Sequence, residues 1–142
     1  MKKYDCLFIG NAIVDVVANV SFEFLKDQNI DVGSWRPTTL DEISQLQNKM
    51  ENILVASGGS AANSAVGFSL LGGKSSFIGR VKADEFGELY VKDLQDANVD
   101  FVSSAVSDGD ETGRCLVYVT PDAQRSMRTY LGAASNLSPD EI

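Results

Sequence analysis

The chain has 142 residues, 44% of them hydrophobic and 23% charged, which is the composition of an ordinary globular domain with one core. Its formal net charge of −8 argues against nucleic acid or an anionic membrane as a partner. These residues include no histidine, which excludes Ser-His-Asp and Cys-His nucleophiles and histidine-ligated zinc.

Hydrophobic periodicity and turn signals divide the chain into alternating strands and helices. An apolar run that ends at Gly10 predicts a buried strand, and Thr39-Leu-Asp-Glu42 is a capping box that predicts a helix start. Gly58-Gly59 ends a later strand, and the small and apolar residues that follow predict a buried helix. The predicted strands are residues 5–10, 12–20, 53–56, 75–78, 101–106, 114–120 and 126–131, and the predicted helices are residues 22–29, 40–50, 60–71 and 84–97.

This order of elements predicts an α/β fold with a mostly parallel sheet. The strands at 12–20 and 114–131 have no helices between them, and a turn at 121–124 joins two of them into a hairpin, so we expect a second, smaller sheet. Near the end, Ser138-Pro-Asp-Glu141 is a strong helix start, from which we expect the chain to belong to a protein roughly twice as long.

Two features bear on the cellular compartment. Cys6 and Cys115 lie in apolar, strand-like segments, so we expect both to be reduced core residues. The first five residues are too polar for a secretory signal, and the apolar run after them is too short. We therefore expect a cytoplasmic protein.

The most informative motif is Ala56-Ser-Gly-Gly-Ser-Ala-Ala-Asn63, which reads as a strand, a Gly-Gly turn and a helix. Free backbone amides at a helix start attract oxygen-rich ligands, and glycines let a ligand contact the main chain. The alternative is a tight turn that only packs the helix on the sheet. The motif is neither a Walker loop nor a dinucleotide-binding Gly-x-Gly-x-x-Gly.

A second motif is Gly10-Asn-Ala-Ile-Val-Asp15. Asn11 and Asp15 follow the first strand, at the carboxyl end where ligands of parallel sheets bind. A carboxylate there could accept hydrogen bonds from two adjacent sugar hydroxyls, and the alternative is a solvated loop aspartate.

Taken together, these motifs resemble the first signature of PfkB/ribokinase-type kinases: Asn11 and Asp15, then Gly58-Gly59-x-x-x-Asn63, then Gly72 or Gly73, and Gly79. Thr112-Gly113-x-Cys115 and Arg125-Ser126-Met127 are closer to the adenosine-kinase branch. The resemblance implies the N-terminal part of a ribokinase-like three-layer α/β sandwich, with a β-sheet lid near residues 12–20 and 114–131.

The resemblance also implies roles for individual residues. Asp15 would bind the ribose 2′ and 3′ hydroxyls together with Gly58, Gly59 and Asn63, and Asn11 would line the same pocket. Trp35, Cys115 and Met127 would line the pocket for the base, although a lone tryptophan is more often a core residue. Arg125 would lie near the transferred phosphate, or it is a solvated charge beside the hairpin turn.

The implied reaction is transfer of the ATP γ-phosphoryl group, with Mg²⁺, to a primary hydroxyl of a nucleoside. The family's catalytic aspartate lies in a Gly-Ala-Gly-Asp motif that these residues do not contain, so we assign no catalytic residue and no metal ligand. A sugar such as ribose or fructose is an alternative acceptor, and a non-catalytic sugar- or nucleoside-binding module is another alternative. Such a protein would be a monomer or a dimer that pairs through its lid.

Overall fold

A computed structural model describes residues 3–142 of the chain, which form an α/β fold, as predicted. Contacts divide it into two compact units. Unit 1 contains the chain up to Val14, Ala56–Gly113 and Leu131–Ile142, and unit 2 contains Asp15–Val55 and Arg114–Tyr130. The strands are β1 (Cys6–Ile9), β2 (Ile13–Asn19), β3 (Trp35–Pro37), β4 (Leu54–Gly58), β5 (Ser75–Ile78), β6 (Val99–Phe101), β7 (Gly113–Val119) and β8 (Arg125–Tyr130). The α-helices are α1 (Phe22–Asp27), α2 (Leu40–Gln47), α3 (Ser60–Leu70) and α4 (Glu85–Asp96), and 3-10 turns cover Gly132–Asn136 and Pro139–Glu141.

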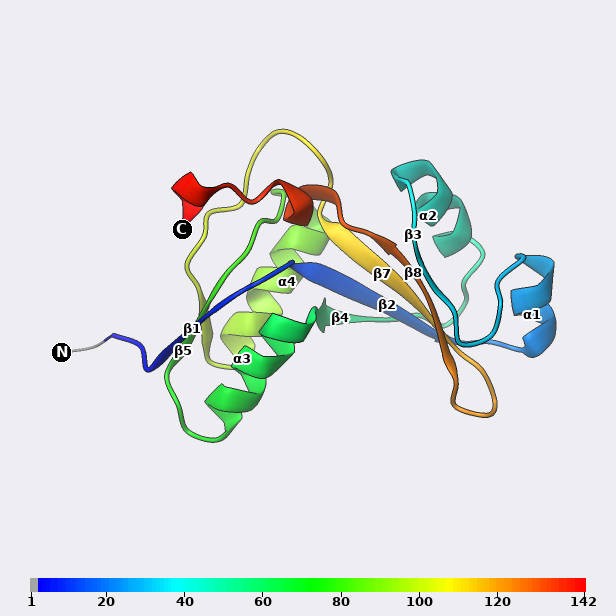
Figure 1. The fold of residues 1–142 in the computed structure, drawn as a ribbon, viewed down its shortest axis with the longest axis horizontal. Helices are drawn as coiled ribbons and strands as arrows, with labels where there is room; N and C mark the ends of the chain where they lie inside the picture. Colours follow the sequence, from blue (N-terminus) through cyan, green and yellow to red (C-terminus); the bar gives the residue numbers. More distant parts are fainter. Residues whose placement is uncertain (1–2) are drawn as a thin grey trace. The chain divides into compact units, whose positions relative to one another are not determined.

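Unit 1 is built on a parallel three-stranded sheet in the order β1-β5-β6. Ser75 and Phe77 lie two residues apart on β5, so their side chains point to the same face. The Ser75 hydroxyl donates to a carbonyl of α3, while the Phe77 ring lies 6.1 Å from the ring of Tyr90 on α4. Both helices therefore cover one face of this sheet (Figure 1).

Helix α3 corrects one prediction, because it is not buried on all sides. Ala62 and Ala65 are buried against the sheet, whereas Leu70 at its end is 78% exposed. The packed side of the helix contacts β1, β5 and β6 of the three-stranded sheet. Small residues thus allow close approach on one side without requiring burial of the other.

The second sheet, called here sheet B, has five strands in the order β3-β8-β7-β2-β4, so it is larger than the parallel sheet, whereas the sequence predicted a smaller one. Strands β7 and β8 form the predicted antiparallel hairpin, and β3 pairs with β8 in parallel. In unit 2 the ring of Phe24 on α1 lies 5.8 Å from the ring of Tyr118, and Arg114 donates to Ser44 on α2. Arg114 and Tyr118 share one face of β7, so α1 and α2 both pack on that face.

Local chemistry explains the helix starts that the sequence predicted. The Thr39 and Asp84 side chains accept from backbone amides of α2 and α4, and Ser138 forms a capping box with Glu141. The two cysteines are free, as expected, but only Cys115 is buried, whereas Cys6 is partly exposed and is not a core residue. Within residues 3–142 the structure has no helix that combines the length and the apolar character needed to cross a membrane.

One strand prediction was wrong, and one strand was missed. The strand expected at 101–106 lies instead at Val99–Phe101, and beyond it only an isolated bridge joins Val106 to Lys82. The apolar residues of that segment were mistaken for ladder positions, although β5 has only four residues to pair with. Strand β3 was not predicted at all.

Candidate functional site

In unit 1 the Gly-Gly turn lies directly before α3. Gly59 is the N-cap residue, with φ of 92° and ψ of 133°, a backbone conformation that residues other than glycine rarely adopt. A Cβ at this position would lie 2.6 Å from the backbone oxygen of Asn11. Glycine is therefore required both for the backbone angle and for the close approach of the segment that follows β1.

The same turn is tied to α4 as well as to β1. Tyr90 donates its hydroxyl hydrogen to the Gly58 carbonyl over 3.3 Å, and Asp93 accepts from the Ser57 amide over 2.8 Å. The first helical hydrogen bond runs from the Asn63 amide to the Gly59 carbonyl. The amides before Asn63 are thus the free donors of the first helical turn, and the Asn11 and Asn63 side chains are exposed.

In unit 2, helices α1 and α2 pack on one face of sheet B, and the opposite face is called here the helix-free face. Five of the site residues proposed from the sequence lie on it. Direct pairing places Met127 opposite Trp35 on one side and Val117 on the other, and it places Thr129 opposite Cys115. Directly paired residues point to the same side of a sheet. The members of this face that the sequence analysis singled out are Asp15, Trp35, Cys115, Arg125 and Met127.

Asp15 belongs to this face by the alternation of β2. Val14 and Val16 are fully buried, whereas Asp15 between them is half-buried. Burial raises the pKa of the Asp15 carboxyl above its usual value, and the positive charge of Arg125 opposes that shift. A carboxylate that lies partly out of water and close to apolar groups is well suited to accept hydrogen bonds from hydroxyls.

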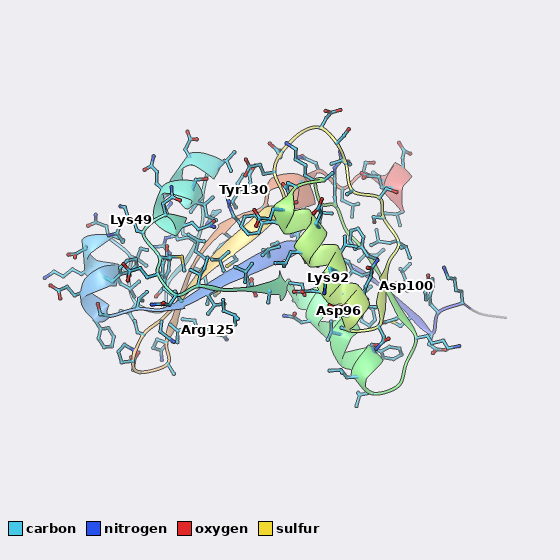
Figure 2. All side chains as sticks on the ribbon, turned by 180° about the vertical axis from the view of Figure 1, so that it is seen from behind. Lys49, Lys92, Asp96, Asp100, Arg125 and Tyr130 are labelled. Carbon is cyan, nitrogen blue, oxygen red and sulfur yellow. The ribbon has the colours of Figure 1, made fainter. Side chains whose placement is uncertain are left out.

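Arg125 is exposed at the start of β8, where the strand leaves the hairpin turn (Figure 2). The positive charge of its guanidinium attracts the Asp15 carboxylate and so acts to lower the pKa of Asp15, against the larger effect of burial. Lys92 and Asp96, an ion pair on one side of α4, belong to an exposed surface and not to this face (Figure 2).

Cys115 is 7% exposed, and burial raises the pKa of its thiol, while a hydrogen bond from Thr129 acts in the opposite direction. The Thr129 hydroxyl lies 3.3 Å from Cys115 Sγ and accepts from Trp35 Nε1 over 3.1 Å. Sequence reasoning missed Thr129. The hairpin register could have revealed it, because Thr129 follows Met127 by two residues and so shares its face.

The structure thus gathers the predicted residues in two groups. Unit 1 holds the turn group, which consists of Asn11, Gly58, Gly59 and Asn63, and unit 2 holds the helix-free face. The hypothesis that one ligand contacts both groups stays a prediction.

Among residues 3–142 no cluster of three or more His, Cys, Asp or Glu side chains could hold a metal ion.

Comparison with known proteins decides the family. Residues 6–142 match the model of the pfkB family of carbohydrate kinases. The chain belongs to the pfkB family. Among solved structures it is similar to adenosine kinase from Sinorhizobium meliloti, with 38% identity over 99% of this chain and a TM-score of 0.91. It is also similar to a probable sugar kinase from Rhizobium etli, with 36% identity over 100% of this chain and the same TM-score of 0.91.

Among curated proteins this pfkB-family chain is similar to a probable chloroplastic fructokinase-6 from Arabidopsis thaliana, with 36% identity over 86 residues. That alignment covers 61% of this chain and 22% of the fructokinase. The two solved structures are each covered to 43%. The chain therefore spans less than half of the length of these relatives.

Proposed function

We propose that this chain is the acceptor-binding portion of an ATP-dependent kinase that phosphorylates a primary hydroxyl of an adenosine-like nucleoside. The observation that supports it is the helix-free face of unit 2, where a half-buried carboxylate shares a surface with Trp35, Cys115 and Met127. A nucleoside needs both chemistries: a carboxylate for vicinal ribose hydroxyls and a mostly apolar surface for the base.

The proposal assigns Asp15 the role of accepting hydrogen bonds from two adjacent hydroxyls of the acceptor. The turn group, Asn11, Gly58, Gly59 and Asn63, would supply amide groups to the same acceptor, and Arg125 would attract the phosphate. Such contacts orient the sugar so that its primary hydroxyl is held for reaction, which is the main contribution that a protein makes to phosphoryl transfer. The strands near 12–20 and 114–131 would serve as the lid that excludes water.

ATP with Mg²⁺ would supply the transferred γ-phosphoryl group and neutralise its charge. Apart from Arg125, which would attract the transferred phosphate, no residue of this chain is assigned to ATP or to Mg²⁺.

A sugar acceptor is the second candidate, and the similarity to fructokinases favours it. Coverage does not rank the two acceptors, because the probable sugar kinase matches 100% of this chain and the adenosine kinase matches 99%, both with a TM-score of 0.91. We place the nucleoside first because the helix-free face combines a carboxylate with an apolar, aromatic surface.

Kinase assays on the full-length protein with ATP and Mg²⁺ would test adenosine, inosine, ribose and fructose side by side. We expect adenosine to have the highest kcat/KM. Phosphorylation of fructose or ribose alone would favour the sugar kinase, and ligand binding without any transfer would favour a non-catalytic binding module.

The role of Asp15 is tested by Asp15→Ala. Loss of one hydrogen bond to a charged group weakens binding by about 1.5–3 kcal/mol, so adenosine affinity should fall about tenfold or more. Asp27→Asn, which removes an exposed carboxylate from α1, is the control and should leave affinity unchanged. Equal affinity of Asp15→Ala and the unmodified protein would refute the assignment.

A further inference from the structure

Three hydrogen bonds in series cross the helix-free face. Trp35 Nε1 donates to Thr129 Oγ1 over 3.1 Å, Thr129 Oγ1 donates to Cys115 Sγ over 3.3 Å, and Cys115 Sγ donates to the Leu116 carbonyl over 3.9 Å. An indole nitrogen can only donate, so the Thr129 hydroxyl must accept from it and has one hydrogen left for the sulfur. The chemistry of the three side chains therefore fixes the direction of the whole series.

Burial differs sharply along this series. Thr129 is 6% exposed, Cys115 is 7% exposed and Trp35 is 60% exposed. The register explains the geometry: Trp35 is paired with Met127, so Thr129 is its diagonal neighbour on the same face. A large aromatic ring is thus exposed to solvent at one side while its polar edge is held by a buried hydroxyl on the adjacent strand.

If Trp35 served only to fill the core, its ring would be buried. If it were an ordinary surface residue, nothing would require a buried hydroxyl to fix its orientation. A fixed, exposed indole provides a flat π-surface, and nucleobases stack on such surfaces because every base has a π-face. A ring held in one orientation also loses less conformational entropy when the base binds.

We propose that Thr129 is a positioning residue that holds the Trp35 indole as a stacking surface, and that this arrangement selects nucleosides over free sugars. The inference rests on the proposed kinase function and adds to it the source of acceptor preference. Thr129 acts through Trp35 and Cys115, and it need not contact the acceptor itself.

The decisive variants are Thr129→Val, which removes the hydroxyl, and Thr129→Ser, which keeps it. In the full-length protein Thr129→Val should lose about tenfold in kcat/KM for adenosine while kcat/KM for fructose and ribose changes by less than about twofold. Thr129→Ser should stay within about twofold of the unmodified protein for all three. Equal losses for nucleoside and sugars, or no rescue by serine, would show a merely structural role.

A spectroscopic measurement tests the positioning directly. Trp35 is the only tryptophan among these 142 residues, and subtracting the signal of the Trp35→Phe variant isolates it in the full-length protein. The fluorescence anisotropy of Trp35 should fall in Thr129→Val and stay unchanged in Thr129→Ser, because only valine frees the ring. Unchanged anisotropy in Thr129→Val overturns the inference.

Trp35→Phe breaks the same hydrogen bond from the exposed side, so it remains informative even where Thr129→Val fails to fold. Its loss of adenosine preference should be at least as large as that of Thr129→Val, because it also shrinks the ring. The double variant should show no further loss beyond that of Trp35→Phe, since both changes break the same hydrogen bond. Additive losses would overturn the inference.

Tyr118→Phe removes a hydroxyl from the opposite face of the same sheet and should change neither adenosine preference nor anisotropy. An enzyme that phosphorylates neither adenosine nor any sugar would end the proposed function, whereas normal adenosine activity in Thr129→Val would end only this inference.

Discussion

Replacing Gly59 by alanine should destabilise the protein far more than the same replacement at Gly72. Both glycines have φ of 92°, so an alanine at either position adopts a backbone angle that costs about 1–2 kcal/mol. Alanine also restricts the unfolded chain, which returns about 0.4–1 kcal/mol. Nothing lies within 4 Å of a Cβ built at Gly72, so Gly72→Ala should cost about 0–1.6 kcal/mol.

At Gly59 a second cost is added. The new Cβ would lie 2.6 Å from the Asn11 backbone oxygen, and a backbone atom cannot rotate away as a flexible side chain can. Forcing one extra carbon into such a packed position costs about 1–3 kcal/mol, so Gly59→Ala should cost about 1–3 kcal/mol more than Gly72→Ala.

Urea unfolding followed by circular dichroism measures both variants, provided that the slope of free energy against urea stays constant. Each kcal/mol should also lower the melting temperature by about 3–5 °C for a chain of this size. Equal losses at Gly59 and Gly72 would refute the reasoning, because they would show that the close approach to Asn11 contributes nothing.

Three further predictions follow from burial and charge. Because burial raises the pKa of Asp15, the folded chain binds this proton more tightly than the unfolded chain does, and ionisation of Asp15 lowers stability as the pH rises through the folded pKa. Asp15→Asn should therefore raise the melting temperature at pH 7, and the gain should shrink as the pH falls toward 4, even though acceptor binding is lost. Tyr118→Phe should leave the melting temperature unchanged or raise it, because the buried Tyr118 hydroxyl, whose pKa burial raises to about 12, has no hydrogen-bond partner among residues 3–142. The Cys115 thiol should react with iodoacetamide much more slowly in the folded protein than in urea, as mass spectrometry of the peptides would show, because burial raises its pKa and the thiolate is the reactive form.

Elements set by local chemistry were predictable from the sequence. The Thr39 N-cap marks the start of α2, although the Glu42 side chain pairs with Arg36 and does not complete the predicted capping box, and the turn at 121–124 marks the β7–β8 hairpin. In each case residues within four positions of one another supply the hydrogen bonds. The glycines of the turn group were also predictable, since a Gly-Gly pair before a helix indicates a tight turn.

Elements set by distant pairing were not predictable. Strand β3 has three residues, one of them proline, and it exists because Trp35 pairs with Met127, which lies more than ninety positions along the chain. The exposure of α3 likewise depends on what packs against it, and its composition alone could not show that only one side contacts the sheet.

The choice between nucleoside and sugar depends on how many hydroxyls the helix-free face can satisfy. The Thr129 hydroxyl is already engaged by Trp35 and Cys115, so the part of this face formed by Trp35, Met127 and Thr129 has no side-chain hydroxyl left for the acceptor. A free hexose would bring several hydroxyls against Met127 and the indole, and each one left unpaired would cost binding energy. A nucleoside concentrates its vicinal hydroxyls at one end and places a flat ring at the other. This separation of polar and flat apolar ends in a nucleoside matches a surface with one carboxylate beside an apolar, aromatic area. It is the physical reason for preferring a nucleoside to a sugar as the proposed acceptor.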